Sequence, residues 1–167
     1  MTRNHKQRGV TLIELLVVIF IISLISGSVL YSSWKGQDQY YVSQSVQKLA
    51  ADLRRTQNMA LSGQTQGAVM PRGYGLYFVS ASRYYLFYNT SADLVYAAGA
   101  SVLLETINLT NNVVVSPVAQ SIYFTPPDPT TYINGANAGS LVLTLTRGVR
   151  SKTITTYSSG KIDISSP

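Results

Sequence analysis

The residues with the clearest chemical potential lie near the start of the chain, where one glutamate meets a long apolar run. Glu14 stands five residues after Gly9, and no charged residue follows it from Leu15 to Trp34. A carboxylate at the edge of such a run is costly unless a positive group meets it, so Glu14 is a candidate functional residue. If the chain were cut after Gly9, the new α-amine of Val10 would be that positive partner.

The elements around Glu14 indicate a membrane helix with a removable leader. The run from Leu15 to Trp34 has 20 residues without a charge, and a helix of that length spans a hydrocarbon core of roughly 30 Å. Residues 1–9 carry three basic residues and no acid, as expected for a cytoplasmic flank. No cleavage site of the Ala-x-Ala type ends the run. We therefore expect cleavage before the helix, which stays with the mature protein.

The segment Gly9-Val10-Thr11-Leu12-Ile13-Glu14-Leu15-Leu16 resembles the class III signal of type IV pilins and type II secretion pseudopilins. The resemblance implies that a prepilin peptidase cuts between Gly9 and Val10 and methylates the new amine of Val10. Glu14 then becomes the fifth mature residue. The family usually begins its mature chain with Phe or Met, so Val10 departs from the pattern.

The same resemblance implies a structural role in filament assembly. The precursor would lie in the inner membrane among lipids, as a single-pass protein with its globular domain outside the cytoplasm. An inner-membrane assembly platform would then pack its helix with those of other pilin or pseudopilin subunits, in a surface pilus or a periplasmic pseudopilus. Glu14 would pair with the Val10 amine of a neighbouring subunit, or screen its own, and would set register more than stability.

The remainder of the chain predicts an α+β fold. Residues 1–9 form the leader, 10–35 the transmembrane or filament-core part of a long N-terminal helix, and 36–66 its amphipathic continuation. The apolar residues of the continuation recur at helical spacing, namely Val42, Val46, Leu49, Leu53 and Ala60. Residues 67–167 are β-rich, and we expect them to form an antiparallel sheet domain packed on the helix.

Within the β-rich part, apolar and aromatic stretches alternate with turn residues. Residues 73–79 and 83–88 predict a hairpin, and residues 126–140 predict a loop because they hold three prolines, two glycines and two asparagines. Gly148 predicts a second hairpin, between 141–146 and 151–157. The pattern of the last third, with its Arg-Gly-x-Arg turn and final Ser-Gly-Lys-Ile-Asp-Ile strand, is similar to the minor pseudopilin H and FimT subgroup. The helix segment 52–63 is similar to the end of that subgroup's helix.

The composition argues against an enzyme. There is no cysteine, and the single histidine, His5, lies in the leader, so the mature chain lacks a nucleophile–base pair of the usual kind. The carboxylates are scattered without a motif. We expect neither a cofactor nor a metal site.

Two alternative functions stay open. Arg147, Arg150, Lys152 and Lys161 are the only basic cluster in the last third, and at the tip of a hairpin they would contact DNA phosphates in a DNA-uptake filament. The competing interpretation of these residues is a solvated turn whose charges protect a sheet edge. The second alternative is an envelope protein held by an uncleaved single-pass anchor.

Overall fold

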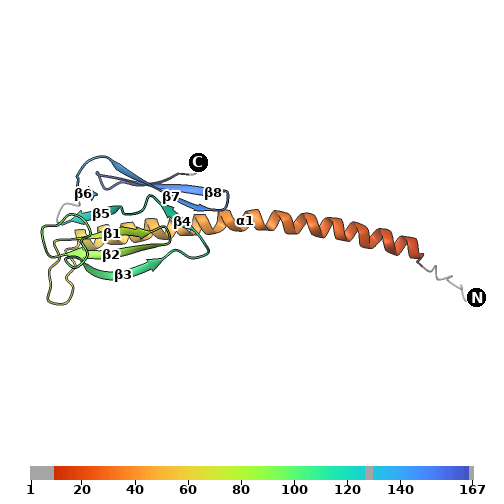
Figure 1. The fold of residues 1–167 in the computed structure, drawn as a ribbon, viewed down its shortest axis with the longest axis horizontal. Coiled ribbons are helices and arrows are strands. Elements are labelled where there is room, and N and C mark those ends of the chain that lie inside the picture. Colours follow the sequence, from red (N-terminus) through yellow and green to blue (C-terminus); the bar gives the residue numbers. More distant parts are fainter. Residues whose placement is uncertain (1–9, 127–129, 166–167) are drawn as a thin grey trace, which may run out of the picture. The chain divides into compact units, whose positions relative to one another are not determined.

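The computed structural model of the protein describes residues 10–126 and 130–165, and for residues 29–36 it describes the backbone alone. The chain divides into two compact units, residues 1–37 and 38–167. The helix α1 (Leu12–Leu61) runs from the first unit into the second. The strands all belong to the second unit, and Figure 1 labels the first eight of them. They are β1 (Gly73–Ser80), β2 (Arg83–Asn89), β3 (Val102–Asn108), β4 (Val114–Ser116), β5 (Ser121–Thr125), β6 (Thr130–Ile133), β7 (Ser140–Arg147), β8 (Arg150–Tyr157) and β9 (Ile162–Ser165).

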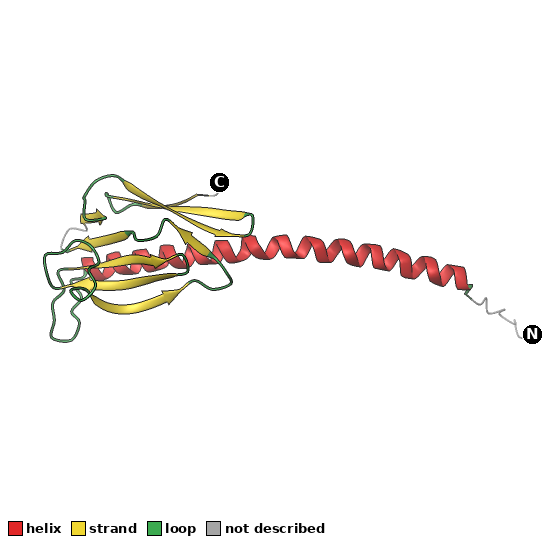
Figure 2. Ribbon diagram, in the orientation of Figure 1, coloured by secondary structure: helices red, strands yellow, loops and turns green. Residues whose placement is uncertain are grey.

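The strands form two antiparallel sheets. The five-stranded sheet has the order β3-β2-β1-β5-β6, and the four-stranded sheet has the order β4-β7-β8-β9. Every strand pair within them is antiparallel. Within the unit 38–167, the strands lie along the second half of α1 (Figure 2). The predicted α+β fold, a helix packed on an antiparallel sheet domain, is confirmed.

One hydrophobic core joins α1 to both sheets. The helix contributes the five residues that the helical spacing predicts, all of them buried: Val42, Val46, Leu49, Leu53 and Ala60. The sheets contribute alternate residues of their inner faces, among them Leu76, Leu86 and Phe124 from the first sheet and Leu143 and Ile154 from the second. Each such side chain contributes about 1.5–3 kcal/mol on burial, so this shared core is what holds helix and sheets together.

The helix ends in a Schellman motif. The Gly63 N–H donates to the Ala60 carbonyl at 3.1 Å, and the Gln64 N–H donates to the Met59 carbonyl at 3.1 Å. Gly63 has a φ of 57°, in the left-handed region that glycine adopts without strain. The last carbonyls of the helix are thereby satisfied, and the chain turns towards β1. The predicted continuation, residues 36–66, runs past this glycine, whereas α1 ends at Leu61.

A second, smaller apolar layer covers the outer face of the five-stranded sheet. The Phe87 and Tyr123 rings stack with centroids 5.9 Å apart, and they lie above Gly75 and Gly73 of β1. A Cβ at Gly75 would come within 2.7 Å of Phe87, and one at Gly73 within 2.7 Å of Tyr123. The two glycines therefore leave the room that the rings occupy. Tyr96, from the loop after β2, stacks on Tyr77 of β1 at 4.6 Å.

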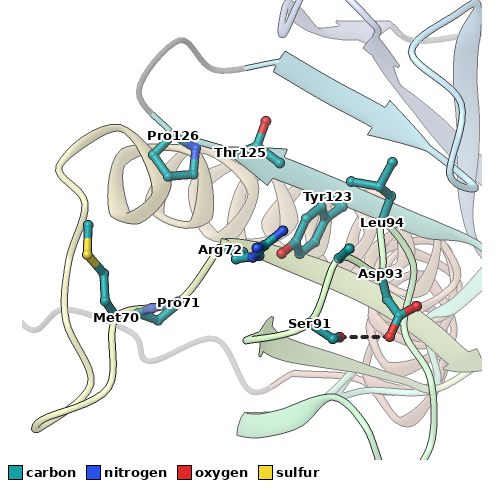
Figure 3. Close-up of a pocket in the computed structure, with 10 residues that line it drawn as sticks. Met70, Pro71, Arg72, Ser91, Asp93, Leu94, Tyr123, Thr125 and Pro126 are labelled. Atoms are coloured by element: carbon teal, nitrogen blue, oxygen red, sulfur yellow. Dashed lines mark hydrogen bonds between the residues drawn. The ribbon is translucent and has the colours of Figure 1, made fainter.

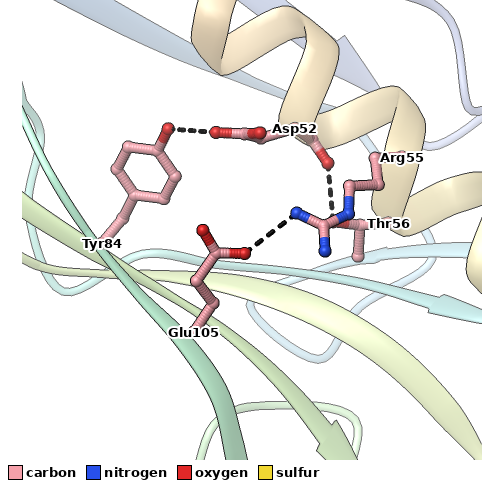
Figure 4. A network of polar contacts seen from close by, with 5 residues as sticks. All are labelled: Asp52, Arg55, Thr56, Tyr84 and Glu105. Atoms are coloured by element: carbon pink, nitrogen blue, oxygen red, sulfur yellow. Dashed lines mark hydrogen bonds and ion pairs between the residues drawn. The ribbon is translucent and has the colours of Figure 1, made fainter.

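Polar contacts tie the helix to the sheet at one further point (Figure 4). The Tyr84 hydroxyl donates to the Asp52 carboxylate at 2.6 Å, and Arg55 pairs with Glu105 at 2.9 Å. Asp52 is half-buried, at a helix position that borders the packed face, and it therefore faces Tyr84. The Arg55–Glu105 pair is about half exposed, so its contribution to stability is small.

The prediction of a loop over 126–140 is wrong in part. Thr130–Ile133 forms β6, which pairs with β5 in the register Thr125↔Thr130 to Ile122↔Ile133. Thr130 and Thr131 are β-branched and Tyr132 is aromatic, and such residues suit a pleated, half-buried surface. Pro126 directly follows the last residue of β5, and β6 begins at Thr130. A four-residue strand is too short for its alternation to stand out among turn residues.

Two tyrosines should make the fold sensitive to alkaline pH. Burial raises the pKa of Tyr123 to about 12, and burial together with the hydrogen bond to Asp52 raises the pKa of Tyr84 further. Below the ordinary pKa of 10.0, both groups are neutral in the folded and unfolded chains. Above it only the unfolded chain loses these protons, so the free energy of unfolding falls by up to about 1.4 kcal/mol per pH unit for each group.

We therefore expect urea unfolding of the full-length chain in nonionic detergent to show stability falling above about pH 10. In the Tyr84→Phe variant, the free energy of unfolding should fall less steeply with pH, because the variant lacks one of the two hydroxyl groups whose pKa is raised by folding. The matched control is Tyr85→Phe, on the half-buried outer face of β2. Equal pH slopes in Tyr84→Phe and the parent chain would contradict this assignment.

Candidate functional site

The structure places Glu14 in the first turn of α1, beside a capped helix end. The Glu14 N–H donates to the Thr11 Oγ1 at 3.3 Å, and the Leu15 N–H donates to the Thr11 carbonyl at 3.2 Å. Thr11 is thus the N-cap, Leu12 is the first helical residue, and Glu14 is the third. An acid at this position is stabilised by the positive end of the helix dipole. Val10 stands one residue outside the cap and is 71% exposed.

Sequence reasoning singled out Glu14 and Val10 but missed Thr11. The signal was present, because Thr-x-x-Glu before an apolar run is the pattern of a capping box. The cap fixes where the helix begins relative to the predicted cleavage point. Gly9 and the rest of the leader, residues 1–9, lie outside the described residues.

The first part of α1 presents an uncovered apolar surface. In the unit 1–37, every side chain described from Val10 to Gly27 is exposed. The large apolar residues among them are each at least 47% exposed: Val10, Leu12, Ile13, Leu15, Leu16, Val17, Val18, Ile19, Phe20, Ile21, Ile22, Leu24 and Ile25. Apolar residues scattered singly on a surface need no explanation, whereas a continuous patch of this size marks a contact with protein or lipid.

Over the described part of the chain, no helix reaches the length and hydropathy expected of a membrane-crossing segment.

The predicted basic cluster is divided in the structure. Arg147 and Arg150 face each other across the β7–β8 hairpin, and Lys152 stands opposite Leu145 on the same face. Lys161 lies at the other end of β8, where the Tyr157 N–H donates to its carbonyl at 2.9 Å. Arg150 and Tyr157 are the two ends of the eight-residue strand β8, a separation of roughly 23 Å. Lys161 is therefore not part of the group at the hairpin tip.

Arg147 and Lys161 are also engaged within the protein. The Arg147 Nε lies 2.8 Å from the Asp38 carboxylate, an Nη donates to the Asn111 carbonyl at 2.7 Å, and the guanidinium lies 4.4 Å from the Tyr41 ring centroid. Lys161 forms an ion pair with Asp163 at 2.7 Å, which raises the pKa of Lys161. Contact of the four cations with DNA stays a prediction. Arg150 and Lys152 form no ion pair among the described residues.

The contacts of Arg147 fix the second half of α1 to the β7–β8 hairpin. The side chains of Arg147 and Asp38 are only 24% and 29% exposed, so solvent screens their pair less than a surface ion pair. Gly148 is required beside it, because a Cβ there would lie 2.8 Å from the Asp38 carboxylate. The sequence indicated the hairpin and its glycine. It gave no signal for Asp38, which is 109 residues away in the chain.

Replacing Arg147 with alanine should lower the free energy of unfolding by about 2 kcal/mol, because Asp38 would be left without its charged partner. The neighbouring cation supplies a matched control, since Arg150 is exposed on the same hairpin, and Arg150→Ala should change stability by less than about 0.5 kcal/mol. Urea unfolding of both variants measures the difference. Equal effects of the two substitutions would show that the Arg147 contacts carry no special weight.

Comparison with known protein families identifies a motif at the N-terminus. Residues 4–30 match the family described as the prokaryotic N-terminal methylation motif, which is the prepilin-type signal of type IV pilins and pseudopilins. The matched segment contains Gly9, Val10, the Thr11 cap, Glu14 and most of the uncovered apolar surface. No curated protein and no solved structure matches the chain. The chain therefore carries the signal of a processed, pilin-like subunit.

Proposed function

We propose that this protein is a minor pilin or pseudopilin, a structural subunit of a type IV pilus or a type II secretion system. A prepilin peptidase would cut it between Gly9 and Val10 and methylate the Val10 amine. The observation that carries the proposal is the coincidence of the methylation motif over residues 4–30 with an apolar helix surface that nothing in its own unit covers. Such a surface needs lipid before assembly and other helices after it.

The proposal assigns the precursor to the inner membrane. The charge-free run from Leu15 to Trp34 would lie in the bilayer, the basic leader would stay in the cytoplasm, and the β-rich domain would lie outside it. The assembly platform would then move the helix from lipid into a bundle of neighbouring helices. The resemblance of the last third to the minor pseudopilin H and FimT subgroup supports a minor role in the filament.

Glu14 would guide this assembly by charge. Because Thr11 begins the helix immediately after Val10, the mature amine and the Glu14 carboxylate would both lie at one end of the rod. In a helix bundle, where the dielectric constant is low, an unpaired Val10 amine is strongly disfavoured. A neighbouring subunit is therefore favoured at the one axial offset that brings its Glu14 carboxylate to this amine. The pair would therefore set the register of the filament.

Processing can be tested by expressing the chain in cells with an active or an inactive prepilin peptidase. We expect the active enzyme to give a shorter chain that remains in the membrane fraction, because the apolar helix follows the cut. The Gly9→Val variant should stay long under both conditions, since a branched side chain would occupy the cleavage point. One unchanged, full-length product with either enzyme would contradict the proposal.

A further inference from the structure

A pocket opens on the five-stranded sheet beneath two connecting segments (Figure 3). Its volume is about 470 Å³, which is within the range of small-molecule sites. Five residues form its apolar walls: Met70, Pro71, Ala92, Leu94 and Pro126. Its polar groups come from Arg72, Asp93 and Tyr123 together with a few smaller side chains. The pocket is thus mainly apolar with a few convergent polar groups, as ligand sites usually are.

The Tyr123 side chain supplies a hydroxyl that has no acceptor within the described protein. Tyr123 is 1% exposed, and its hydroxyl forms no hydrogen bond. A buried hydroxyl without a partner costs about 1–3 kcal/mol, so folding alone gives no reason to keep it. Gly73 makes the room for it, because a Cβ there would lie 2.8 Å from the hydroxyl oxygen. With its pKa raised to about 12 by burial, the hydroxyl is a neutral donor at physiological pH.

Arg72 supplies a second donor beside the first. Figure 3 shows its guanidinium on the hydroxyl side of the Tyr123 ring, and its charge acts on the Tyr123 hydroxyl. The backbone of Arg72 is fixed, because its N–H donates to the Asn89 carbonyl at 2.8 Å. Its side chain is exposed, and no ion pair to it occurs among the described residues. The Arg72 guanidinium and the Tyr123 hydroxyl are thus two donors that line the same mainly apolar pocket without a hydrogen-bond or ion-pair partner among the described residues.

The opposite rim of the pocket is held in place by hydrogen bonds. The Asn89 side chain is fully buried, and its Nδ2 donates to the carbonyls of Asp93 and Val95 at 2.7 and 3.0 Å. The Asp93 carboxylate accepts from the Ser91 hydroxyl at 2.7 Å. The negative charge of Asp93 repels a dianion such as phosphate more strongly than a monocarboxylate. A single carboxylate can therefore reach the Arg72 and Tyr123 donors at a lower electrostatic cost.

We propose that this pocket binds a small monocarboxylate with an apolar group, either an organic acid or the C-terminus of a peptide that ends in an apolar residue. The carboxylate accepts hydrogen bonds from the Arg72 guanidinium and the Tyr123 hydroxyl. The apolar group lies against Met70, Pro71 and Leu94. None of its lining residues lies on α1, so the site is separate from the apolar helix surface on which the proposed function rests.

Three probes test the proposal on the full-length chain in nonionic detergent: 4-methylpentanoate, acetyl-Gly-Gly-Leu with a free carboxylate, and the same peptide as its amide. Isothermal titration should show saturable binding of at least one acid and at least about tenfold weaker binding of the amide, because the charge-assisted hydrogen bonds are lost. Equal affinity for the two acids identifies a site for organic acids, and preference for the peptide identifies a site for chain ends.

Variants then locate the bound carboxylate. Arg72→Gln should weaken acid binding by about tenfold or more, and Tyr123→Phe by about fivefold. Arg54→Gln, an exposed arginine outside the pocket, should bind as the parent does. Tyr123→Phe should fold normally, because it removes only the unpaired hydroxyl, and an unfolding curve verifies this. Equal affinities for acid and amide, equal effects of Arg72→Gln and Arg54→Gln, or no saturable binding of any probe would overturn the proposal.

Discussion

Replacement of Glu14 by alanine is expected to lower incorporation of the protein into filaments by at least about tenfold, while membrane insertion is retained. Under the proposed function, the substitution would leave the Val10 amine of the mature chain without a carboxylate in the helix bundle. Leaving one charge of a buried pair unmatched costs about 3–5 kcal/mol, and every 1.4 kcal/mol is a factor of ten. Insertion is retained because the apolar run is unchanged. The measurement is the amount of the chain in sheared or purified filaments relative to the amount in membranes.

A matched acid on the sheet domain separates the role of Glu14 from a general effect of lost charge. Glu105 is exposed on β3, and its ion pair among the described residues is with the exposed Arg55, so Glu105→Ala should be incorporated as the parent is. A Glu14→Gln variant keeps hydrogen bonding and removes the charge, and it should resemble Glu14→Ala. If filaments contain Glu14→Ala and Glu105→Ala at equal levels, the carboxylate has no part in assembly.

Replacing Gly75 with alanine should lower the free energy of unfolding by about 3 kcal/mol. The new Cβ would lie 2.7 Å from the Ile122 carbonyl oxygen and 2.7 Å from the Phe87 ring. The carbonyl belongs to β5, which pairs with β1 through Leu76↔Ile122, so relief of the clash disturbs the sheet. Phe87 is itself fully buried and has little room to move. Urea unfolding of the full-length chain measures the loss.

Two further variants test the cause of that loss. Gly27 lies in α1, and a Cβ there meets nothing within 4 Å. Gly27→Ala should therefore cost nothing and should favour the helix by about 1 kcal/mol. In a Phe87→Leu background, Gly75→Ala should cost less than in the parent, because the smaller side chain gives room. A Gly75→Ala variant as stable as the parent would show that the glycine serves no packing role.

The sequence predicted the fold well where its pattern is periodic. Val42 to Ala60 follow the helical period, and burial confirms each of the five residues chosen. The hairpin at Gly148 has long alternating strands and a residue with a φ of 56° at its turn. By contrast, β6 is four residues long and follows a proline-rich stretch, so local composition outweighed its β propensity.

The contacts that arise between distant parts of the chain could not be predicted in this way. Nothing in the sequence near Arg147 points to Asp38, and nothing near Gly73 points to the Tyr123 ring. The first contact depends on how the β7–β8 hairpin packs on α1, and the second on the pairing of β1 with β5. The Thr11 cap is different, because it involves only residues that are close in the sequence and follows the capping-box pattern.

The most direct test of the account is the mass of the N-terminal peptide of the protein isolated from cells with an active prepilin peptidase. The account predicts a peptide that begins with N-methylated Val10 and continues Thr-Leu-Ile-Glu. A peptide that begins at Met1 and retains the leader through Gly9 would contradict it.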